Sequence, residues 1–193
     1  NSRVIMDRAI PFIQKATQAR QPFFSIIWFH TPHLPVVAGP RHAAMYRDHP
    51  KYAQHYYGCI TAMDEQVGRL RGELRKLSAA ENTLLFFCSD NGPEGQTGKA
   101  PGSAGHLSGR KRSLLEGGIR VPGLVEWPAR IKPGRTTNIP CVTSDYLPTI
   151  LALLGVEPIT DRPIDGISLV PLFDGKLAKR GRPIGFESKG QTA

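Results

Sequence analysis

Hydrophobic positions along the chain follow two periodicities, and together they predict a layered arrangement of strands and helices. Short apolar runs at residues 23–29 and 84–88 are typical of strands buried on both faces. Apolar residues spaced three and four apart predict amphipathic helices over residues 4–19, 51–77 and 146–154. Because strands alternate with helices, we expect an α/β fold that contains part of a mostly parallel sheet sandwiched by helices.

Proline, glycine and capping residues set the expected ends of these elements. Pro11 predicts a kink or a boundary in the first helix. Ser144 and Asp145 can cap the third helix, and Gly155 is expected to end it. A further short strand is expected at residues 123–127.

Polar groups follow the two buried strands at the point where each is expected to end. His30 and His33 come after the first strand, and Asp90 and Asn91 come after the second. The carboxyl ends of parallel strands share one edge of the sheet, where ligands bind in open α/β folds. Carboxylate and amide oxygens suit Ca²⁺ or Mg²⁺, and histidine can give a proton near neutral pH.

A third polar set lies at the end of a long glycine-rich loop, residues 92–113, and consists of Lys111, Glu116 and Arg120. Long loops of this kind are usually functional or mobile. A metal, a lysine and a proton donor at one edge would suit the cleavage of an oxyanion ester, in which charge builds on the oxygens. Structural explanations remain open, because Lys111 fits a solvated basic turn and the other two fit an ion pair.

Composition and charge exclude several classes of protein. The net charge is +9, but the basic residues are scattered and no aromatic-interleaved basic stripe suggests binding to nucleic acid. Apolar runs long enough to span a membrane do not occur. The three cysteines form no CxxC pair, so the sequence offers no zinc or redox motif.

Several short blocks occur in a fixed order along roughly residues 20–175. They are residues 23–35, 63–68, 89–94, 109–122, 144–149 and 165–169. This ordered set resembles the type I sulfatase family of the alkaline-phosphatase-like superfamily, and it is far more specific than any one block alone.

The resemblance implies roles for individual residues. Asp90 and Asn91 would bind the active-site Ca²⁺ (or Mg²⁺) of a sulfatase. Lys111 would contact the sulfate, and His33 would lie beside the sulfate and the leaving oxygen. His106 lies in the glycine-rich loop near the expected substrate mouth, which suggests a substrate-binding role.

Three further residues are expected to contact and orient these site residues without touching the substrate: His30, Glu116 and Arg120. The nucleophile of the family is a formylglycine made in a Cys/Ser-x-Pro-x-Arg motif, and no such motif occurs in this sequence. We therefore expect an incomplete sulfatase-like domain that is inactive alone. Residues 1–175 would form the C-terminal portion of the catalytic domain, and residues 176–193 would start, or link to, a small C-terminal subdomain.

The resemblance implies a sulfuric ester hydrolase that acts on a sulfated small molecule or a sulfated carbohydrate, with export to the periplasm, the cell exterior or the lysosome. Specificity is expected in the loops at residues 36–50 and 93–109. One alternative is a metal-dependent phosphoesterase of the same superfamily, although such sites usually hold more histidine and aspartate ligands than this sequence offers. The other is a non-catalytic basic module that binds sulfated polysaccharide, with a steep dependence on salt.

Overall fold

The computed structural model describes residues 1–96, 99–158 and 161–193, and the chain divides into two compact units. Unit 1 consists of Asn1–Thr83 and Gly95–Ser103, and unit 2 consists of Leu84–Glu94 and Ala104–Ala193. Two residues of the predicted specificity loop, 97 and 98, lie outside the described residues. Residues 159 and 160 of the predicted catalytic portion also lie outside them.

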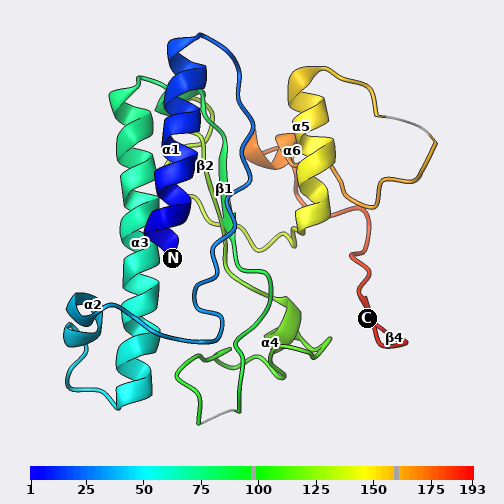
Figure 1. The fold of residues 1–193 in the computed structure, drawn as a ribbon. Coiled ribbons are helices and arrows are strands. Elements are labelled where there is room, and N and C mark those ends of the chain that lie inside the picture. Colours follow the sequence, from blue (N-terminus) through cyan, green and yellow to red (C-terminus); the bar gives the residue numbers. More distant parts are fainter. Residues whose placement is uncertain (97–98, 159–160) are drawn as a thin grey trace. The chain divides into compact units, whose positions relative to one another are not determined.

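Two long helices that pack side by side form the core of unit 1: α1 (Ser2–Gln18) and α3 (Lys51–Lys76) (Figure 1). Both helices were predicted from their apolar periodicity. The core side chains that they bury are Met6, Ile10, Ile13, Leu70 and Leu74. Each such side chain stabilises the folded state by about 1.5–3 kcal/mol through the removal of apolar area from water.

Polar contacts at the rim of this interface fix the two helices against each other. Gln14 donates a hydrogen bond to Glu73 Oε1 at 2.6 Å, and Arg69 pairs with Asp7. Pro11 lies inside α1, and the helix continues past it, so the predicted boundary is wrong. Burial of apolar side chains on both sides of Pro11 against α3 offsets the backbone hydrogen bond that proline cannot make.

Two short helices complete unit 1. They are α2 (Pro40–Ala44), which packs on α3, and the 3₁₀ turn η1 (Ala80–Asn82). No helix of the described residues combines the length and the apolarity needed to cross a membrane.

Residues 23–29, predicted as a buried strand, form neither a strand nor a buried segment. Phe24, Ile26 and Trp28 are exposed, and Trp28 keeps 81% of its surface accessible. The prediction failed because an apolar run shows that a segment can be buried, but it does not supply a hydrogen-bonded partner. Among the described residues no strand pairs with this segment.

Unit 2 is built on the antiparallel pair β1 (Leu85–Cys88) and β2 (Gly123–Glu126), in which Leu85 lies opposite Glu126. Both strands were predicted, and the α/β class is confirmed. The pairing is antiparallel, whereas parallel pairing was expected. The side chains of β1 are half-buried, because the sheet has two strands and not the several that would cover both faces.

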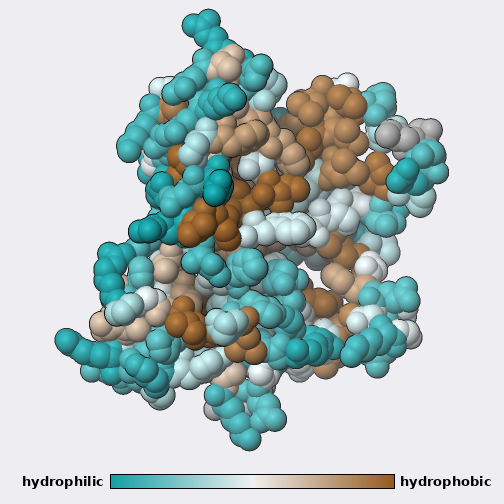
Figure 2. Space-filling model, viewed as in Figure 1, coloured by the Kyte–Doolittle hydropathy of each residue, from teal (hydrophilic) through white to brown (hydrophobic). Residues whose placement is uncertain are grey.

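Aromatic rings connect this strand pair to the helices of unit 2, α5 (Tyr146–Leu154) and α6 (Val170–Phe173). Phe86 stacks on Tyr146 with ring centroids 4.3 Å apart, and Phe173 is buried. Leu147 and Leu154 of α5 are exposed, with Leu154 70% accessible, and Figure 2 shows hydrophobic side chains gathered over this helix.

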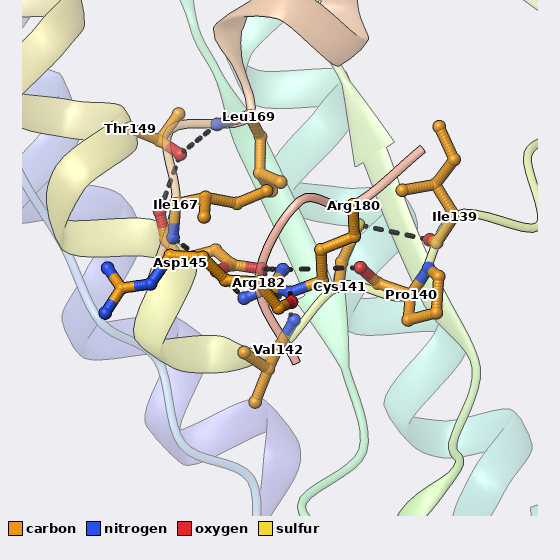
Figure 3. A network of polar contacts seen from close by, with 10 residues as sticks. All are labelled: Ile139, Pro140, Cys141, Val142, Asp145, Thr149, Ile167, Leu169, Arg180 and Arg182. Atoms are coloured by element: carbon orange, nitrogen blue, oxygen red, sulfur yellow. Dashed lines mark hydrogen bonds and ion pairs between the residues drawn. The ribbon is translucent and has the colours of Figure 1, made fainter. Parts of the chain in front are cut away.

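A buried ion pair between Asp145 and Arg180 fixes the region before α5 (Figure 3). Asp145 ends the 3₁₀ turn η2 (Thr143–Asp145) and is fully buried. Arg180 Nη1 and Nη2 donate to its two carboxylate oxygens at 2.7 and 2.9 Å. The backbone N–H groups of Val142 and Ile167 also donate to this carboxylate. The expected cap is not formed: the Asp145 side chain makes no cap hydrogen bond to α5, because its oxygens are already engaged.

Burial raises the pKa of Asp145, but the hydrogen bonds from Arg180, Ile167 and Val142 outweigh it and hold the pKa below its usual value. Through Arg180 the ion pair attaches the segment after residue 175 to the rest of unit 2. This segment ends in a small antiparallel hairpin, β3 (Glu187–Ser188) with β4 (Gln191–Thr192). The predicted division at residue 175 stays a prediction.

Candidate functional site

Three segments of unit 2 that carry predicted site residues are joined by backbone hydrogen bonds. The N–H of Gly92 donates to Gly118 O at 2.8 Å, and the N–H of Lys111 donates to Pro93 O at 3.1 Å. The segments are residues 89–93, 108–113 and 116–120, and we call them the glycine-linked region. Asp90, Asn91, Lys111, Glu116 and Arg120 all belong to this region.

Glycine is required at the contacts between these segments. A Cβ on Gly92 would lie 1.9 Å from Gly117 O, and one on Gly118 would lie 2.0 Å from Ser113 O. Both distances are far inside van der Waals contact, so a larger residue would push the segments apart. The Asn-Gly and Glu-Gly-Gly sequences therefore serve close backbone approach as well as turn formation.

Asp90 and Asn91 follow β1 directly, as predicted, and offer two oxygens of the kind that Ca²⁺ and Mg²⁺ prefer. The Asn91 amide nitrogen donates to Gly92 O at 3.0 Å, which leaves Oδ1 free to bind a cation. The Asp90 side chain is exposed and makes no hydrogen bond to another described residue.

Asp90 and Asn91 offer the type of ligand that a divalent metal ion prefers, but two ligands are too few, because Ca²⁺ takes roughly six to eight oxygen ligands. The described residues contain no cluster of three or more His, Cys, Asp or Glu side chains that could hold a metal. Asp90 and Asn91 would thus be part of a ligand set.

Lys111 is the middle residue of a basic triplet whose two arginines bind Glu94. Arg112, with a φ of +74°, pairs with the Glu94 carboxylate, and Arg110 donates to Glu94 O at 2.9 Å. Lys111 is half-buried, and its ammonium group has no partner among the described residues. The triplet therefore supplies one cation that remains free to bind an anion.

Glu116 and Arg120 form an ion pair of 3.0 Å at the short helix α4 (Glu116–Ile119). His106 is exposed in unit 2, within a turn in which the N–H of Leu107 donates to Ala104 O. Its predicted contact with substrate and the supporting role of the ion pair stay predictions.

His33 and His30 belong to unit 1, where the chain between them forms a tight turn. The N–H of His33 donates to His30 O at 2.7 Å, and the Thr31–Pro32 and Leu34–Pro35 peptide bonds are cis. His33 Nδ1 lies 2.9 Å from Leu34 O. A carbonyl oxygen can only accept a hydrogen bond, so Nδ1 carries its hydrogen and Nε2 is free to take up or release a proton.

Both histidines line a cleft of about 640 Å³ in unit 1, which we call the unit 1 cleft. Its lining also includes a charged cluster that the sequence pattern did not indicate: Arg41, His42 and Glu65. Glu65 lies in one of the sulfatase-like blocks, but charged residues on a helix are usually a solvated face. The hydrogen bond with His42 lowers the pKa of Glu65, and the charge of Arg41 lowers it further.

The sequence of this chain is similar to those of known sulfatases. The chain matches the sulfatase family over residues 1–156. N-acetylgalactosamine-6-sulfatase of Sus scrofa is 33% identical over 193 residues, which covers 99% of this chain and 35% of the relative. The chain thus spans about a third of the length of that enzyme.

Two solved structures are similar in fold. Ps i-CgsB in complex with k-i-k-neocarrahexaose has a TM-score of 0.82 at 33% identity, over 91% of this chain and 38% of that one. BT4656, in complex with its substrate D-glucosamine-2-N,6-O-disulfate, has a TM-score of 0.54 at 25% identity, over 79% and 32%. The chain belongs to the sulfatase family.

Proposed function

We propose that this chain is part of a sulfuric ester hydrolase, and that it contributes Lys111, Asp90, Asn91 and His33 to the active site. The observation that carries the proposal is the glycine-linked region. Its backbone hydrogen bonds hold an unpaired lysine and an adjacent carboxylate–amide pair on joined segments. A cation and two hard oxygens are what a sulfate group and a divalent metal ion require.

Each residue has a distinct task in this proposal. The Lys111 ammonium group binds the non-bridging oxygens of the sulfate, where negative charge increases as the ester bond breaks. Asp90 and Asn91 would hold Ca²⁺ or Mg²⁺, which when bound supplies Lewis-acid stabilisation of the same charge.

His33 acts on the leaving group. When the S–O bond breaks, the alcohol oxygen keeps the electron pair and takes a proton from Nε2 of the doubly protonated ring, which leaves a neutral ring with its hydrogen on Nδ1. The hydrogen bond from Nδ1 to Leu34 O fixes the orientation of the ring, so Nε2 is the nitrogen that transfers the proton.

The nucleophile would come from outside residues 1–193. The resemblance implies a formylglycine, and the sequence contains no Cys/Ser-x-Pro-x-Arg motif from which one could form. The 193-residue chain would then bind sulfate esters without turning them over, because nucleophilic catalysis needs its nucleophile.

The proposed substrate is a sulfated carbohydrate or a sulfated small molecule. The name of the Sus scrofa relative and the substrate of BT4656 support a sulfated amino sugar as the first candidate to try. Export from the cytoplasm belongs to the proposal as well, from the family resemblance.

The test is hydrolysis of p-nitrophenyl sulfate, in Ca²⁺, by the protein as its cell produces it. We expect activity, and we expect Lys111→Met to lower kcat/KM by about 10²–10³-fold, as the loss of one group that stabilises developing charge does. Lys132→Met, which removes an exposed lysine outside the glycine-linked region, should leave kcat/KM unchanged. The two variants carry the same change of charge.

Two outcomes would count against the proposal. Faster hydrolysis of p-nitrophenyl phosphate than of the sulfate would identify the phosphoesterase alternative. Metal-independent binding of sulfated polymer with a steep salt dependence, and no hydrolysis of either ester, would identify the non-catalytic module.

A further inference from the structure

The unit 1 cleft contains an arginine, Arg41, that uses only one of its three guanidinium nitrogens in contacts with other described residues. Arg41 Nη2 lies 2.7 and 2.6 Å from the two carboxylate oxygens of Glu65, so a single nitrogen makes both contacts. The only other contact of this side chain among the described residues also uses Nη2, at 2.9 Å from His42 Nε2. The edge formed by Nε and Nη1 is therefore without a partner in the described parts of the chain.

Packing of α2 on α3 holds this arginine in place. Gly58 of α3 permits the approach, because a Cβ there would lie 2.8 Å from the Cβ of Ala38 and 2.9 Å from the carbonyl carbon of His42. The N–H of Ala38 donates to His55 Nδ1 at 3.2 Å, which fixes the segment before α2. Arg41 thus stands on a fixed support, although its side chain is 72% exposed.

His42 adds to this support in either of its neutral forms. With a proton on Nε2 it donates to Glu65 Oε2 at 3.0 Å, and without that proton it accepts from Arg41. In both forms Arg41 Nη2 stays on Glu65 and the opposite edge of the guanidinium stays free. Because the His42 side chain is largely buried, at 16% exposed, the cluster is held from the protein side and not from solvent.

The free edge belongs to the same cleft as the proposed proton donor. His33 and Arg41 both line the unit 1 cleft, as does Arg3. Glu65 is the only carboxylate among the described residues that line it. The cleft therefore attracts anions, and its arginine presents the planar pair of N–H groups that matches a sulfate or a carboxylate.

We propose that Arg41 is a specificity-determining residue that binds a second anionic group, sulfate or carboxylate, on a sugar whose scissile sulfate ester lies at His33. Glu65 and His42 are positioning residues that orient its guanidinium. This inference rests on the proposed function for the identity of the first sulfate. It goes beyond that function by assigning the substrate at least two negative charges.

The test compares the binding of two 6-O-sulfated sugars, one with a sulfate and one with an uncharged acetyl group on the amino nitrogen, by isothermal titration calorimetry with the full 193-residue chain. The probes are D-glucosamine-2-N,6-O-disulfate and N-acetylglucosamine 6-O-sulfate. We expect the disulfate to bind at least about tenfold more tightly. A difference of this size is what one charge-assisted, hydrogen-bonded pair contributes to affinity. Because binding needs no turnover, this result stands apart from the hydrolysis test of the proposed function.

Substitutions then attribute the preference to Arg41. Arg41→Gln should reduce the ratio of the two affinities to about one, and Arg41→Lys should restore only part of it, because lysine keeps the charge but not the two-pronged geometry. Glu65→Gln should reduce the ratio of the two affinities by about threefold, because Arg41 keeps its charge but loses the ion pair with Glu65 that orients it. Arg47→Gln is the matched control, since Arg47 is exposed in the same segment but does not line the cleft.

The second anion is identified by one more sugar, a disaccharide with one sulfate and one uronate carboxylate. Retention of the Arg41 effect with this sugar means that either anion serves, and loss of the effect means that sulfate is required. Equal losses in the Arg41→Gln and Arg47→Gln variants would overturn the proposal in favour of general electrostatic attraction. Equal affinity of the unsubstituted chain for the two glucosamine sulfates would also overturn it.

Discussion

The two regions that hold the predicted site residues are constructed in opposite ways. In the glycine-linked region of unit 2, segments far apart in sequence are joined by backbone hydrogen bonds, and glycines allow the contact. In the unit 1 cleft, His33 is held by its neighbours in the chain, His30 and Leu34, within a segment rich in proline. The first region therefore depends on tertiary structure, whereas the second depends mainly on local sequence.

This difference predicts how each region responds to mutation. Substitutions of the glycines in the glycine-linked region should act through folding of unit 2, whereas substitutions in the unit 1 cleft should act on binding and leave stability nearly unchanged. Three variants follow in order of decreasing expected effect: Gly92→Ala and Arg180→Gln disturb tertiary contacts of unit 2, and Gly72→Ala changes an open position in a helix of unit 1.

Gly92→Ala should have the largest effect. A Cβ placed 1.9 Å from Gly117 O would break the hydrogen bond between Gly92 and Gly118, with a loss of more than about 4 kcal/mol in the free energy of unfolding. Urea denaturation, monitored by tryptophan fluorescence, measures this loss of stability, because Trp127 lies in unit 2.

Gly123→Ala is the control for this variant, since a Cβ there meets no atom within 4 Å and the backbone needs no positive φ. We expect a change of no more than about 1 kcal/mol. Similar losses for the two variants would mean that close backbone approach at Gly92 is unimportant.

Arg180→Gln should have the next largest effect. It leaves the buried carboxylate of Asp145 without its cation, at a cost of about 3–5 kcal/mol. Arg162→Gln breaks an exposed pair with Asp161 and should cost less than about 1 kcal/mol. Chemical denaturation of both variants at neutral pH gives the comparison.

The low pKa of Asp145 adds a dependence on pH. Because its folded pKa lies below the unfolded value of about 3.9, its contribution to stability is complete above that pH. The contribution is lost as the pH falls through the folded pKa, so this part of the acid destabilisation should be much smaller in Arg180→Gln. An unchanged acid profile in the variant would show that Arg180 is not what lowers the pKa.

Gly72→Ala in α3 should have the smallest effect, and the opposite sign to Gly92→Ala. A Cβ there meets nothing within 4 Å, and alanine is the better helix former, so unit 1 should gain about 0.5–1 kcal/mol. A thermal unfolding scan would show a small rise in Tm. A fall in Tm would mean that this face of α3 has a packing role that its open surroundings do not suggest.

The elements that the sequence predicted well are those whose pattern is local. The helix α3 was predicted at nearly its observed bounds, because its apolar residues repeat at helical spacing along all 26 residues. The turn that carries Asp90 and Asn91 was found because polar residues end an apolar run abruptly. The glycine contacts were not predicted, because the partners of Gly92, Gly117 and Gly118 cannot be named from sequence.

The errors arose where the deciding partner is remote in sequence. Asp145 was interpreted as a helix cap because Ser-Asp before an apolar helix is a capping pattern, whereas its partner Arg180 follows 35 residues later. Residues 23–29 have the composition of a strand, but pairing depends on a neighbour that composition does not reveal. The Arg41–Glu65 cluster was missed for the same reason, because each residue alone fits a solvated surface.

We propose that these 193 residues carry part of a sulfatase site and depend on a nucleophile from elsewhere. The most direct test is hydrolysis of p-nitrophenyl sulfate in Ca²⁺ by a sample whose intact mass is confirmed as 21.2 kDa. We expect no turnover above that of the Lys111→Met variant. Turnover by the 21.2 kDa chain that is lost in this variant would contradict it, because the nucleophile would then lie within the sequence.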